Sequence, residues 1–337
     1  MADIKVLVVD DSLTMRALIS RVLETLPGIT VVGAANGAEE ARAEVVRLKP
    51  DVMTLDIEMP GMNGIEYLAE LMDSRPMPVI MFSTRTEAGA SSSIEALRLG
   101  AIDCFPKPKA ASQTEFDAIL GKLGTRIRTA KLSVARPAKV APIRSFDWNG
   151  RMLTIGTDAS GTQKLFDLLG SFPANCPPTL VIPHLGAELI DSLISRLNEQ
   201  SAATVVKAQN ALTPEQGRIY VTQPGAAHFG IDKWPGGQIR QMTRDPLAGE
   251  RPSISLMFAA QAKAAGDQAI GIMLSDAGED GKAGLGALLK AGGHALAPAS
   301  LLSGVPDQTD YILRQGDSSE VVSWEHFAAK ALGLCSK

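Results

Sequence analysis

The chain has 337 residues, of which 45% are hydrophobic and 21% charged, and a formal net charge of −4. This length and apolar content exclude a single small module and a chain that is disordered throughout, and they favour about two globular domains. The three cysteines are far apart and form no CxxC pair, which excludes a disulfide framework or a cysteine zinc site and is typical of a reducing compartment. No apolar stretch is long enough for a signal peptide or a membrane span, so we expect a cytoplasmic protein without membrane insertion.

Residues 1–125 are predicted to form the first domain. Short apolar runs alternate there with stretches of helical period such as LTMRALISRVLETL and AEEARAEVVRL. Because strands that alternate with helices build parallel sheets covered by helices, this pattern predicts an α/β fold with a five-stranded parallel sheet. The five predicted strands are IKVLVV, ITVVGA, DVMTL, PVIMF and AIDCF.

Residues 126–147 are predicted to be a basic, proline-containing linker. Residues 126–146 carry six Lys or Arg and no acidic residue, whereas residues 1–125 have a net charge of −6. We interpret the stretch as a solubilising tether or as a basic strip that contacts an acidic partner or domain. Six cations between two acidic domains, without a helix-turn-helix or zinc-finger pattern, argue against nucleic-acid binding.

Residues 148–337 are predicted to form a second α/β domain with a mainly parallel sheet. Apolar runs again alternate with helical patterns, among them TQKLFDLL, AELIDSLISRLN and SLMFAAQAKAA. The predicted strands are RMLTIG, PTLVIPH, ATVVKA, GRIYVTQP and AIGIMLS.

Polar side chains follow four of the five predicted strands of the first domain. Side chains just past the carboxyl ends of parallel strands converge on one crevice. Clustered carboxylates repel one another unless a divalent cation lies among them, and an all-oxygen site suits Mg²⁺. A carboxylate beside Mg²⁺, with an ammonium and a hydroxyl near it, is equipped for acyl-phosphate chemistry. The residues are Asp10 and Asp11 after the first strand, Asp56 (the central one and the best nucleophile) after the third, Ser83 after the fourth and Lys107 after the fifth.

Each aspartate taken alone could be only a cap or turn residue, but the whole set argues against that reading. The motifs VVDDS, LDIEMPGMNG, the Ser83-Thr84 pair and the KP pair resemble the receiver domain of two-component response regulators, which has a flavodoxin-like fold. The resemblance implies that a chemotaxis-type histidine kinase phosphorylates Asp56. It implies further that Mg²⁺ is held by Asp10, Asp11 and Asp56, and that the phosphate is sensed by Ser83 and Lys107.

One position departs from the receiver pattern. Cys104 stands three residues before the lysine, where receivers usually carry an aromatic residue, and Phe105 is next to it. This departure puts the usual aromatic readout of phosphorylation in question, but not phosphorylation itself.

The second domain resembles, over about residues 151–320, the catalytic domain of the chemotaxis protein-glutamate methylesterases, in which a linker joins a receiver to an esterase domain. The matching motifs are IG of RMLTIG, PHL with His184, TQPGAAH with His228, GEDGKAGL with Asp280, AGGHA and GVP. The resemblance implies hydrolysis of methyl esters and deamidation of glutamines on the cytoplasmic helices of chemoreceptors. It also implies an intramolecular interface through which the receiver covers the active-site face until phosphorylation releases it.

The nucleophile position of this second domain is altered. A serine hydrolase needs a hydroxyl at a strand-to-helix turn, a histidine base and an orienting carboxylate. His184 is predicted to be the base and Asp280 the orienting carboxylate, although Asp280 could also cap the helix KAGLGALLKA. Aligned with the family's IGASTGG, the turn IGTDASGT places Asp158 at the serine position, where a carboxylate is a poor nucleophile and repels an oxyanion. Ser160 is the hydroxyl that could substitute.

Two functional interpretations therefore stay open. Either the second domain is an active esterase, or the protein is a non-catalytic phospho-switch or phosphate sink whose esterase-like domain only binds partners. The segment DAG at residues 276–278, in place of the family's GMG, adds a charge beside the site and favours the second interpretation. A third interpretation, in which Asp158 acts as the base for a water molecule, has only the position of Asp158 in its favour.

Overall fold

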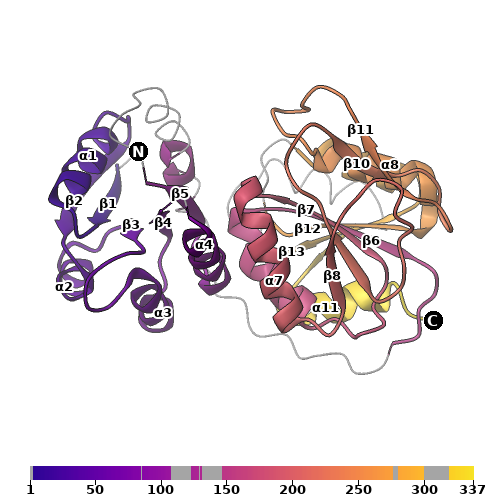
Figure 1. Ribbon diagram of the computed structural model, residues 1–337, viewed down its shortest axis with the longest axis horizontal. Coiled ribbons are helices and arrows are strands. Elements are labelled where there is room, and N and C mark those ends of the chain that lie inside the picture. The colour runs from indigo at the N-terminus through magenta and orange to yellow at the C-terminus, as the bar shows by residue number, and fades with distance from the viewer. Residues whose placement is uncertain are drawn as a thin grey trace. The chain divides into compact units, whose positions relative to one another are not determined.

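The computed structural model describes residues 3–84, 86–107, 123–128, 130, 146–275, 280–299 and 319–337. The chain divides into two compact units, Met1–Arg136 and Pro137–Lys337 (Figure 1). Most of the predicted linker lies outside the described residues, and the boundaries at residues 125 and 147 remain predictions. In the described part of the chain, no helix is both long and apolar enough to cross a lipid bilayer.

The first unit is built on a five-stranded sheet with the strand order β2-β1-β3-β4-β5, and every pairing in it is parallel. The five-stranded parallel sheet predicted from the sequence is therefore confirmed. Strands alternate with helices along the chain: β1 (Ile4–Val9), α1 (Leu13–Leu23), β2 (Ile29–Ala35), α2 (Ala38–Leu48), β3 (Val52–Asp56), α3 (Gly64–Ser74), β4 (Val79–Ser83), α4 (Glu87–Leu99) and β5 (Asp103–Pro106).

Apolar runs and capping residues explain these elements. Every residue of β3 and β4 is buried, as expected for central strands of a sheet that is covered on both faces. The helix α3 begins with a capping box, in which Asn63 and Glu66 each accept a hydrogen bond from the other's backbone N–H.

The turn between β3 and α3 closes tightly around Gly64. The Gly64 N–H donates to the carbonyl oxygen of Ile57 at 2.9 Å. A Cβ atom at this position would overlap the backbone oxygen of Asp56. The glycine of the MNG segment therefore lets the helix begin directly against the backbone of Asp56.

The second unit contains a seven-stranded sheet with the order β14-β13-β12-β6-β7-β9-β8, all of it parallel, and a separate antiparallel pair, β10 with β11. The predicted mainly parallel sheet is confirmed, and the antiparallel pair was not predicted. The strands are β6 (Met152–Asp158), β7 (Thr179–His184), β8 (Thr204–Lys207), β9 (Arg218–Val221), β10 (His228–Ile231), β11 (Ile239–Met242), β12 (Ala269–Met273), β13 (His294–Pro298) and β14 (Ser319–Val322).

The helices of this unit connect the strands and place the candidate site at one sheet edge. They are α6 (Thr162–Gly170), α7 (Ile190–Gln200), α8 (Ile254–Ala265), α9 (Lys282–Lys290) and α11 (Trp324–Gly333), with short 3₁₀ turns η1 (Ala159–Gly161), η2 (Ala187–Leu189) and η3 (Gly266–Gln268). The neighbouring strands β6 and β7 end in register, with Asp158 opposite His184. This is the carboxyl edge of a parallel sheet, where ligand sites of such folds form.

Candidate functional site

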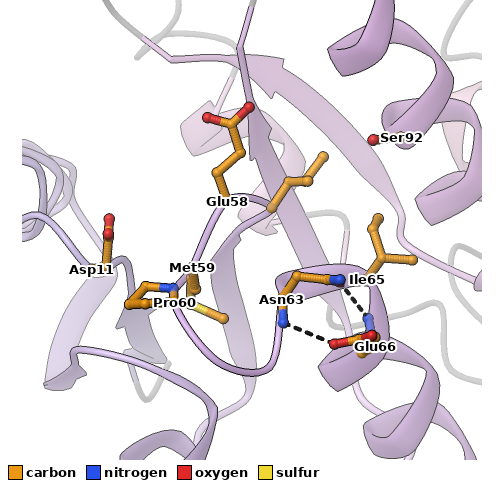
Figure 2. Close-up of a pocket in the computed structure, with 9 residues that line it drawn as sticks. Asp11, Glu58, Met59, Pro60, Asn63, Ile65, Glu66 and Ser92 are labelled. Atoms are coloured by element: carbon orange, nitrogen blue, oxygen red, sulfur yellow. Dashed lines mark hydrogen bonds between the residues drawn. The ribbon is translucent and has the colours of Figure 1, made fainter.

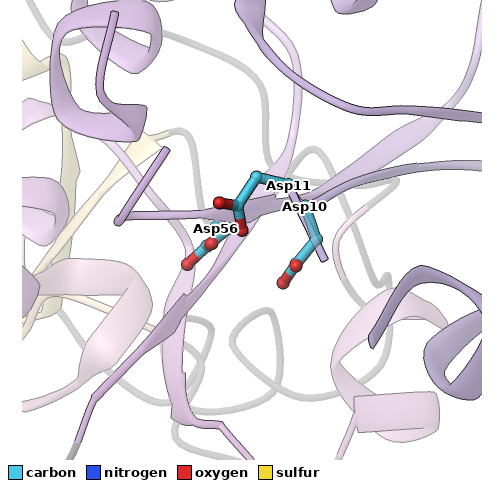
Figure 3. Close-up of side chains that lie close together, drawn as sticks. All are labelled: Asp10, Asp11 and Asp56. Atoms are coloured by element: carbon cyan, nitrogen blue, oxygen red, sulfur yellow. The ribbon is translucent and has the colours of Figure 1, made fainter. Parts of the chain in front are cut away.

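The three aspartates predicted to hold a metal lie together in the first unit. Carboxylate oxygens of Asp10, Asp11 and Asp56 come within 4.8 Å of one another at the ends of β1 and β3 (Figure 3). Asp10 and Asp56 are completely buried, whereas Asp11 is exposed. The structure thus brings together residues that are about 45 positions apart in the sequence.

Lys107 reaches into this cluster from the segment after β5. Its Nζ lies 2.6 Å from Asp56 Oδ2 and 3.5 Å from Asp10 Oδ2. The other oxygen of each carboxylate accepts a backbone hydrogen bond, from Glu58 N–H for Asp56 and from Ser12 N–H for Asp10. The structure therefore places Lys107 beside Asp56, the central aspartate, as the sequence predicts.

Burial dominates the electrostatics of the cluster. It raises the pKa of Asp56 to about 6; the hydrogen bond from Lys107 lowers this pKa by more than the charge of Asp10 raises it, but burial prevails. The pKa of Asp10 is also raised, again chiefly by burial. Burial alone would lower the pKa of Lys107, but its hydrogen bond to Asp56 and the nearby carboxylates raise it. One ammonium thus leaves the negative charge of the cluster incompletely balanced.

The donor set fits a magnesium ion. Asp10 Oδ2 is buried and accepts no hydrogen bond. This oxygen can therefore coordinate a metal ion. Three carboxylates from two neighbouring strand ends form the oxygen-only set that Mg²⁺ prefers.

A pocket of about 540 Å³ lies beside the cluster and shares Asp11 with it (Figure 2). Its wall also includes the carboxylates of Glu58 and Glu66 and the apolar side chains of Met59 and Pro60. The pocket therefore opens next to the exposed member of the acidic cluster.

Ser83, predicted to sense the phosphate, ends β4 and is 7% exposed. Its hydroxyl lies 2.9 Å from the hydroxyl of Ser93 in α4. The sequence analysis missed Ser93, since nothing distinguishes it from the two serines before it.

In the second unit, Asp158 ends β6 and caps the turn η1. Its Oδ1 accepts hydrogen bonds from the Ser160 backbone N–H at 3.0 Å and from the Ser160 hydroxyl at 2.6 Å. The predicted substitute hydroxyl of Ser160 thus donates to Asp158, and in the described part of the chain it makes no hydrogen bond to His184.

His184 and Asp280, predicted to be base and orienting carboxylate, are in contact. His184 Nε2 lies 3.4 Å from Asp280 Oδ2 and 3.2 Å from the carbonyl oxygen of Pro252. Because a carbonyl oxygen only accepts, Nε2 carries a proton here and Nδ1 is the nitrogen left to accept one. Burial alone would lower the pKa of His184, but the hydrogen bond to Asp280 and the charge of Glu250 raise it.

Asp280 also holds the start of α8. It accepts the backbone N–H groups of Ile254 and Ser255 and the hydroxyl of Ser253, all at 2.7–2.9 Å. The helix after Asp280, α9, has Gly281 as its N-cap. The Asp280 carboxylate therefore caps the first turn of α8, a helix that begins about 25 residues earlier in the sequence. No local sequence pattern indicates this contact.

The surroundings of this site contain two further titratable residues, His228 and Lys164. His228, which matched the family motif, is buried; its Nδ1 accepts the Ser253 N–H at 3.0 Å and its Nε2 lies 3.0 Å from the carbonyl oxygen of Asp245. Sequence reasoning did not identify Lys164 in α6. Burial lowers the pKa of Lys164, although the negative charges of Asp158 and Asp167 act in the opposite direction. The predicted extra charge at residues 276–278 lies outside the described residues.

Comparisons with known proteins cover both units. The model of the CheB methylesterase family matches residues 153–331, and that of the response regulator receiver domain matches residues 6–115. A protein-glutamate methylesterase/protein-glutamine glutaminase from Caulobacter vibrioides is 42% identical over 303 residues, which is 88% of each chain. One from Rhizobium etli is 40% identical over 298 residues, 88% of this chain and 86% of that one. The chain belongs to the CheB methylesterase family.

As a member of the CheB methylesterase family, the chain is a chemotaxis response regulator with a receiver domain and a methylesterase domain. Its fold agrees with that of the catalytic domain of Thermotoga maritima CheB methylesterase, at a TM-score of 0.50 and 23% sequence identity over 55% of this chain and 99% of that one. The receiver and methylesterase families suggested by the sequence motifs are therefore confirmed.

Proposed function

We propose that Asp56 is the phosphoacceptor of this response regulator, with a chemotaxis-type histidine kinase as donor. The observation that carries this proposal is the contact of Asp56 Oδ2 with Lys107 Nζ at 2.6 Å inside a cluster of three carboxylates. Magnesium, held by Asp10, Asp11 and Asp56, would neutralise the oxygens of the incoming phosphoryl group.

The residues around Asp56 have separate tasks in this proposal. Asp56, with a pKa of about 6, is mostly ionised at neutral pH and can attack phosphorus through a carboxylate oxygen, while the P–N bond to the phosphohistidine of the kinase breaks and the imidazole leaves. The backbone N–H of Glu58 holds the other oxygen of Asp56 at 3.1 Å and fixes the plane of the carboxylate. After transfer, Lys107 exchanges its contact with the carboxylate for one with a phosphoryl oxygen, and Ser83 senses the same group.

Phosphorylation of the full-length chain with acetyl phosphate tests this proposal. We expect one acid-stable but base-labile phosphoryl group per chain in the presence of Mg²⁺, and none with a chelator or in Asp56→Asn. A chain that is labelled equally in Asp56→Asn would contradict the assignment of the phosphoacceptor.

We propose further that the methylesterase domain binds chemoreceptor helices without hydrolysing their esters, because one observation favours this second candidate function. The carboxylate of Asp158, at the end of β6, accepts hydrogen bonds from both the backbone N–H and the hydroxyl of Ser160. The hydroxyl nearest the family's nucleophile position is therefore engaged with a carboxylate rather than with the base His184. A carboxylate at this place would also repel the oxyanion of an acyl intermediate.

Release of methanol from methylated chemoreceptor by the phosphorylated full-length chain tests the binding-only proposal. We expect no release above background from the native chain and measurable release from Asp158→Ser, because His184 and Asp280 are already in contact. Release by the native chain that is abolished in Ser160→Ala would show that Ser160 has become the nucleophile. Binding of the receptor fragment by the native chain is the positive control.

The proposed partners follow from these two activities. They are the histidine kinase, the cytoplasmic helices of chemoreceptors, and the receiver as an intramolecular partner of the methylesterase domain. Because all of them act on the cytoplasmic side in this family, we propose the cytoplasm as the location of the chain.

A further inference from the structure

A loop between β11 and α8 is closed at its neck by a buried histidine, His228. The strand β10, which begins with His228, pairs with β11 and packs against α8 (Figure 1). His228 is completely buried, its Nε2 lies 3.0 Å from the carbonyl oxygen of Asp245, and its Nδ1 accepts the backbone N–H of Ser253 at 3.0 Å. One side chain thus bridges both ends of the segment 245–253.

The two contacts are compatible with one protonation state of His228. A backbone N–H can only donate, so Nδ1 holds a lone pair, and a carbonyl oxygen can only accept, so Nε2 carries the proton. His228 is therefore a neutral imidazole with both nitrogens engaged. An apolar side chain could fill the same volume, but it would leave the buried N–H of Ser253 and the carbonyl of Asp245 without this partner.

The residues held by this bridge contact the pair of His184 and Asp280. The carbonyl oxygen of Pro252 lies 3.2 Å from His184 Nε2, the nitrogen that also lies 3.4 Å from Asp280 Oδ2. The next residue is Ser253, and its hydroxyl donates to Asp280 Oδ1 at 2.8 Å. Each member of the pair is thus contacted by a residue at the His228 end of the loop.

The rest of the loop is more exposed. Its tip is a tight turn, Leu247–Glu250, closed by two backbone hydrogen bonds between its end residues, and the whole turn is exposed. The loop has a second tie, in which Arg251 Nε donates to the carbonyl oxygen of Gly225 at 2.7 Å, but this contact lies at the surface. His228 is therefore the buried anchor of the loop.

We propose that His228 is a positioning residue for His184 in the methylesterase domain. By bridging Asp245 and Ser253, it fixes the Pro252 carbonyl against His184, which keeps the His184 proton on Nε2 and leaves Nδ1 to accept a proton. This role concerns the geometry of the site, so it holds for an active esterase and for a domain that only binds.

Nuclear magnetic resonance of the full-length chain, labelled with nitrogen-15 at its four histidines, tests the proposal. At a pH above the titration of His184, we expect the protons of His184 and His228 on Nε2, with the His184 proton protected from exchange with water. In His228→Leu this proton should exchange about 2- to 10-fold faster, the worth of one neutral hydrogen bond. His228→Ala replaces His228→Leu if that variant does not fold.

Two further variants separate positioning from a loss of packing. His228→Asn retains an acceptor for the Ser253 N–H, so it should exchange the His184 proton more slowly than His228→Leu does. Phe229→Leu is the matched control, because Phe229 is the next residue of β10, is 2% exposed and has no polar side-chain atom. Wild-type exchange in His228→Leu, no difference between His228→Leu and His228→Asn, or equal acceleration in Phe229→Leu would overturn the proposal.

Methanol release by the Asp158→Ser chain connects this geometry with chemistry. In that background His228→Leu should lower kcat at least about tenfold and change KM little, because the base is misplaced while the receptor-binding surface is kept. An unchanged kcat would overturn the proposal. If Asp158→Ser itself releases no methanol, the expectation attached to the binding-only proposal fails, whereas exchange of the His184 proton still decides the role of His228.

Discussion

Burial of a carboxylate has opposite outcomes for two residues of this chain. Asp56 and Asp280 are both buried, yet the pKa of Asp56 is raised to about 6 while that of Asp280 is lowered to about 2. Burial raises both values, but Asp280 accepts hydrogen bonds from His184 and from the first turn of α8, which more than compensate. Asp56 has only one backbone donor besides Lys107, so the effect of burial prevails and its pKa stays raised.

The low pKa of Asp280 predicts a pH-dependent contribution to stability. Because its folded pKa lies below the unfolded value, the contribution is complete above about pH 4 and is lost as the pH falls through about 2. We expect Asp280→Asn to lower the free energy of unfolding by about 2 kcal/mol at pH 7 and by less as the pH approaches 2.

Tryptophan fluorescence during urea unfolding measures this loss, since all three tryptophans, at positions 148, 234 and 324, lie in the second unit. Asp191→Asn is the control, because this residue is 78% exposed and pairs at the surface with Lys207. A loss in Asp280→Asn that stays constant down to pH 2 would argue against the linkage.

At the scale of secondary-structure elements, each site depends on a helix that begins against an aspartate of the site. In the first unit α3 starts beside β3, and Gly64 allows that approach. In the second unit the first turn of α8 donates its backbone N–H groups to Asp280, which lies between β12 and α9. The chemistry of each site therefore depends on one close contact between a helix start and a carboxylate.

Substitution of Gly64 should damage the proposed phosphorylation site through the backbone. A methyl group at Gly64 overlaps the backbone oxygen of Asp56, so the turn or the strand end must shift. We expect Gly64→Ala to destabilise the first domain by more than about 2 kcal/mol and to slow phosphorylation by acetyl phosphate at least about tenfold. Gly37→Ala, where a methyl group meets no atom within 4 Å, is the control and should leave both properties unchanged.

At the scale of the whole molecule, the two units have separate cores and separate chemistry. The first contains the acidic cluster with Lys107, and the second contains the pair of His184 and Asp280. In the described residues, the acidic cluster is the one group of three or more potential metal-ligating side chains. A metal ion should therefore stabilise one unit and not the other.

Magnesium should raise the unfolding temperature of the first unit by mass action. At a concentration about 100-fold above the dissociation constant, we expect a gain of about 2.7 kcal/mol for that unit and none for the second. Differential scanning calorimetry with and without Mg²⁺ follows both transitions. Asp11→Asn is the informative variant, because Asp11 is exposed and its loss should abolish the shift without unfolding the domain.

Sequence reasoning predicted most of the first site, because its residues sit directly after strands that apolar runs identify. Asp10, Asp56 and Lys107 follow predicted strands and meet in the structure as expected. Ser93 could not be predicted, because its place opposite Ser83 depends on how α4 packs against β4. The link from Asp280 to α8 likewise spans about 25 residues, and no local pattern contains it.

The sequence by itself determined the two α/β domains, the parallel sheets and the residue types at the strand ends, because apolar periodicity and strand-end chemistry are local properties. Only the tertiary structure decided which proton-bearing groups face one another: Ser160 donates to Asp158, His184 contacts Asp280, and Ser83 meets Ser93. These pairings depend on the packing of helices against sheets, which side-chain volumes and close backbone contacts settle over the whole domain.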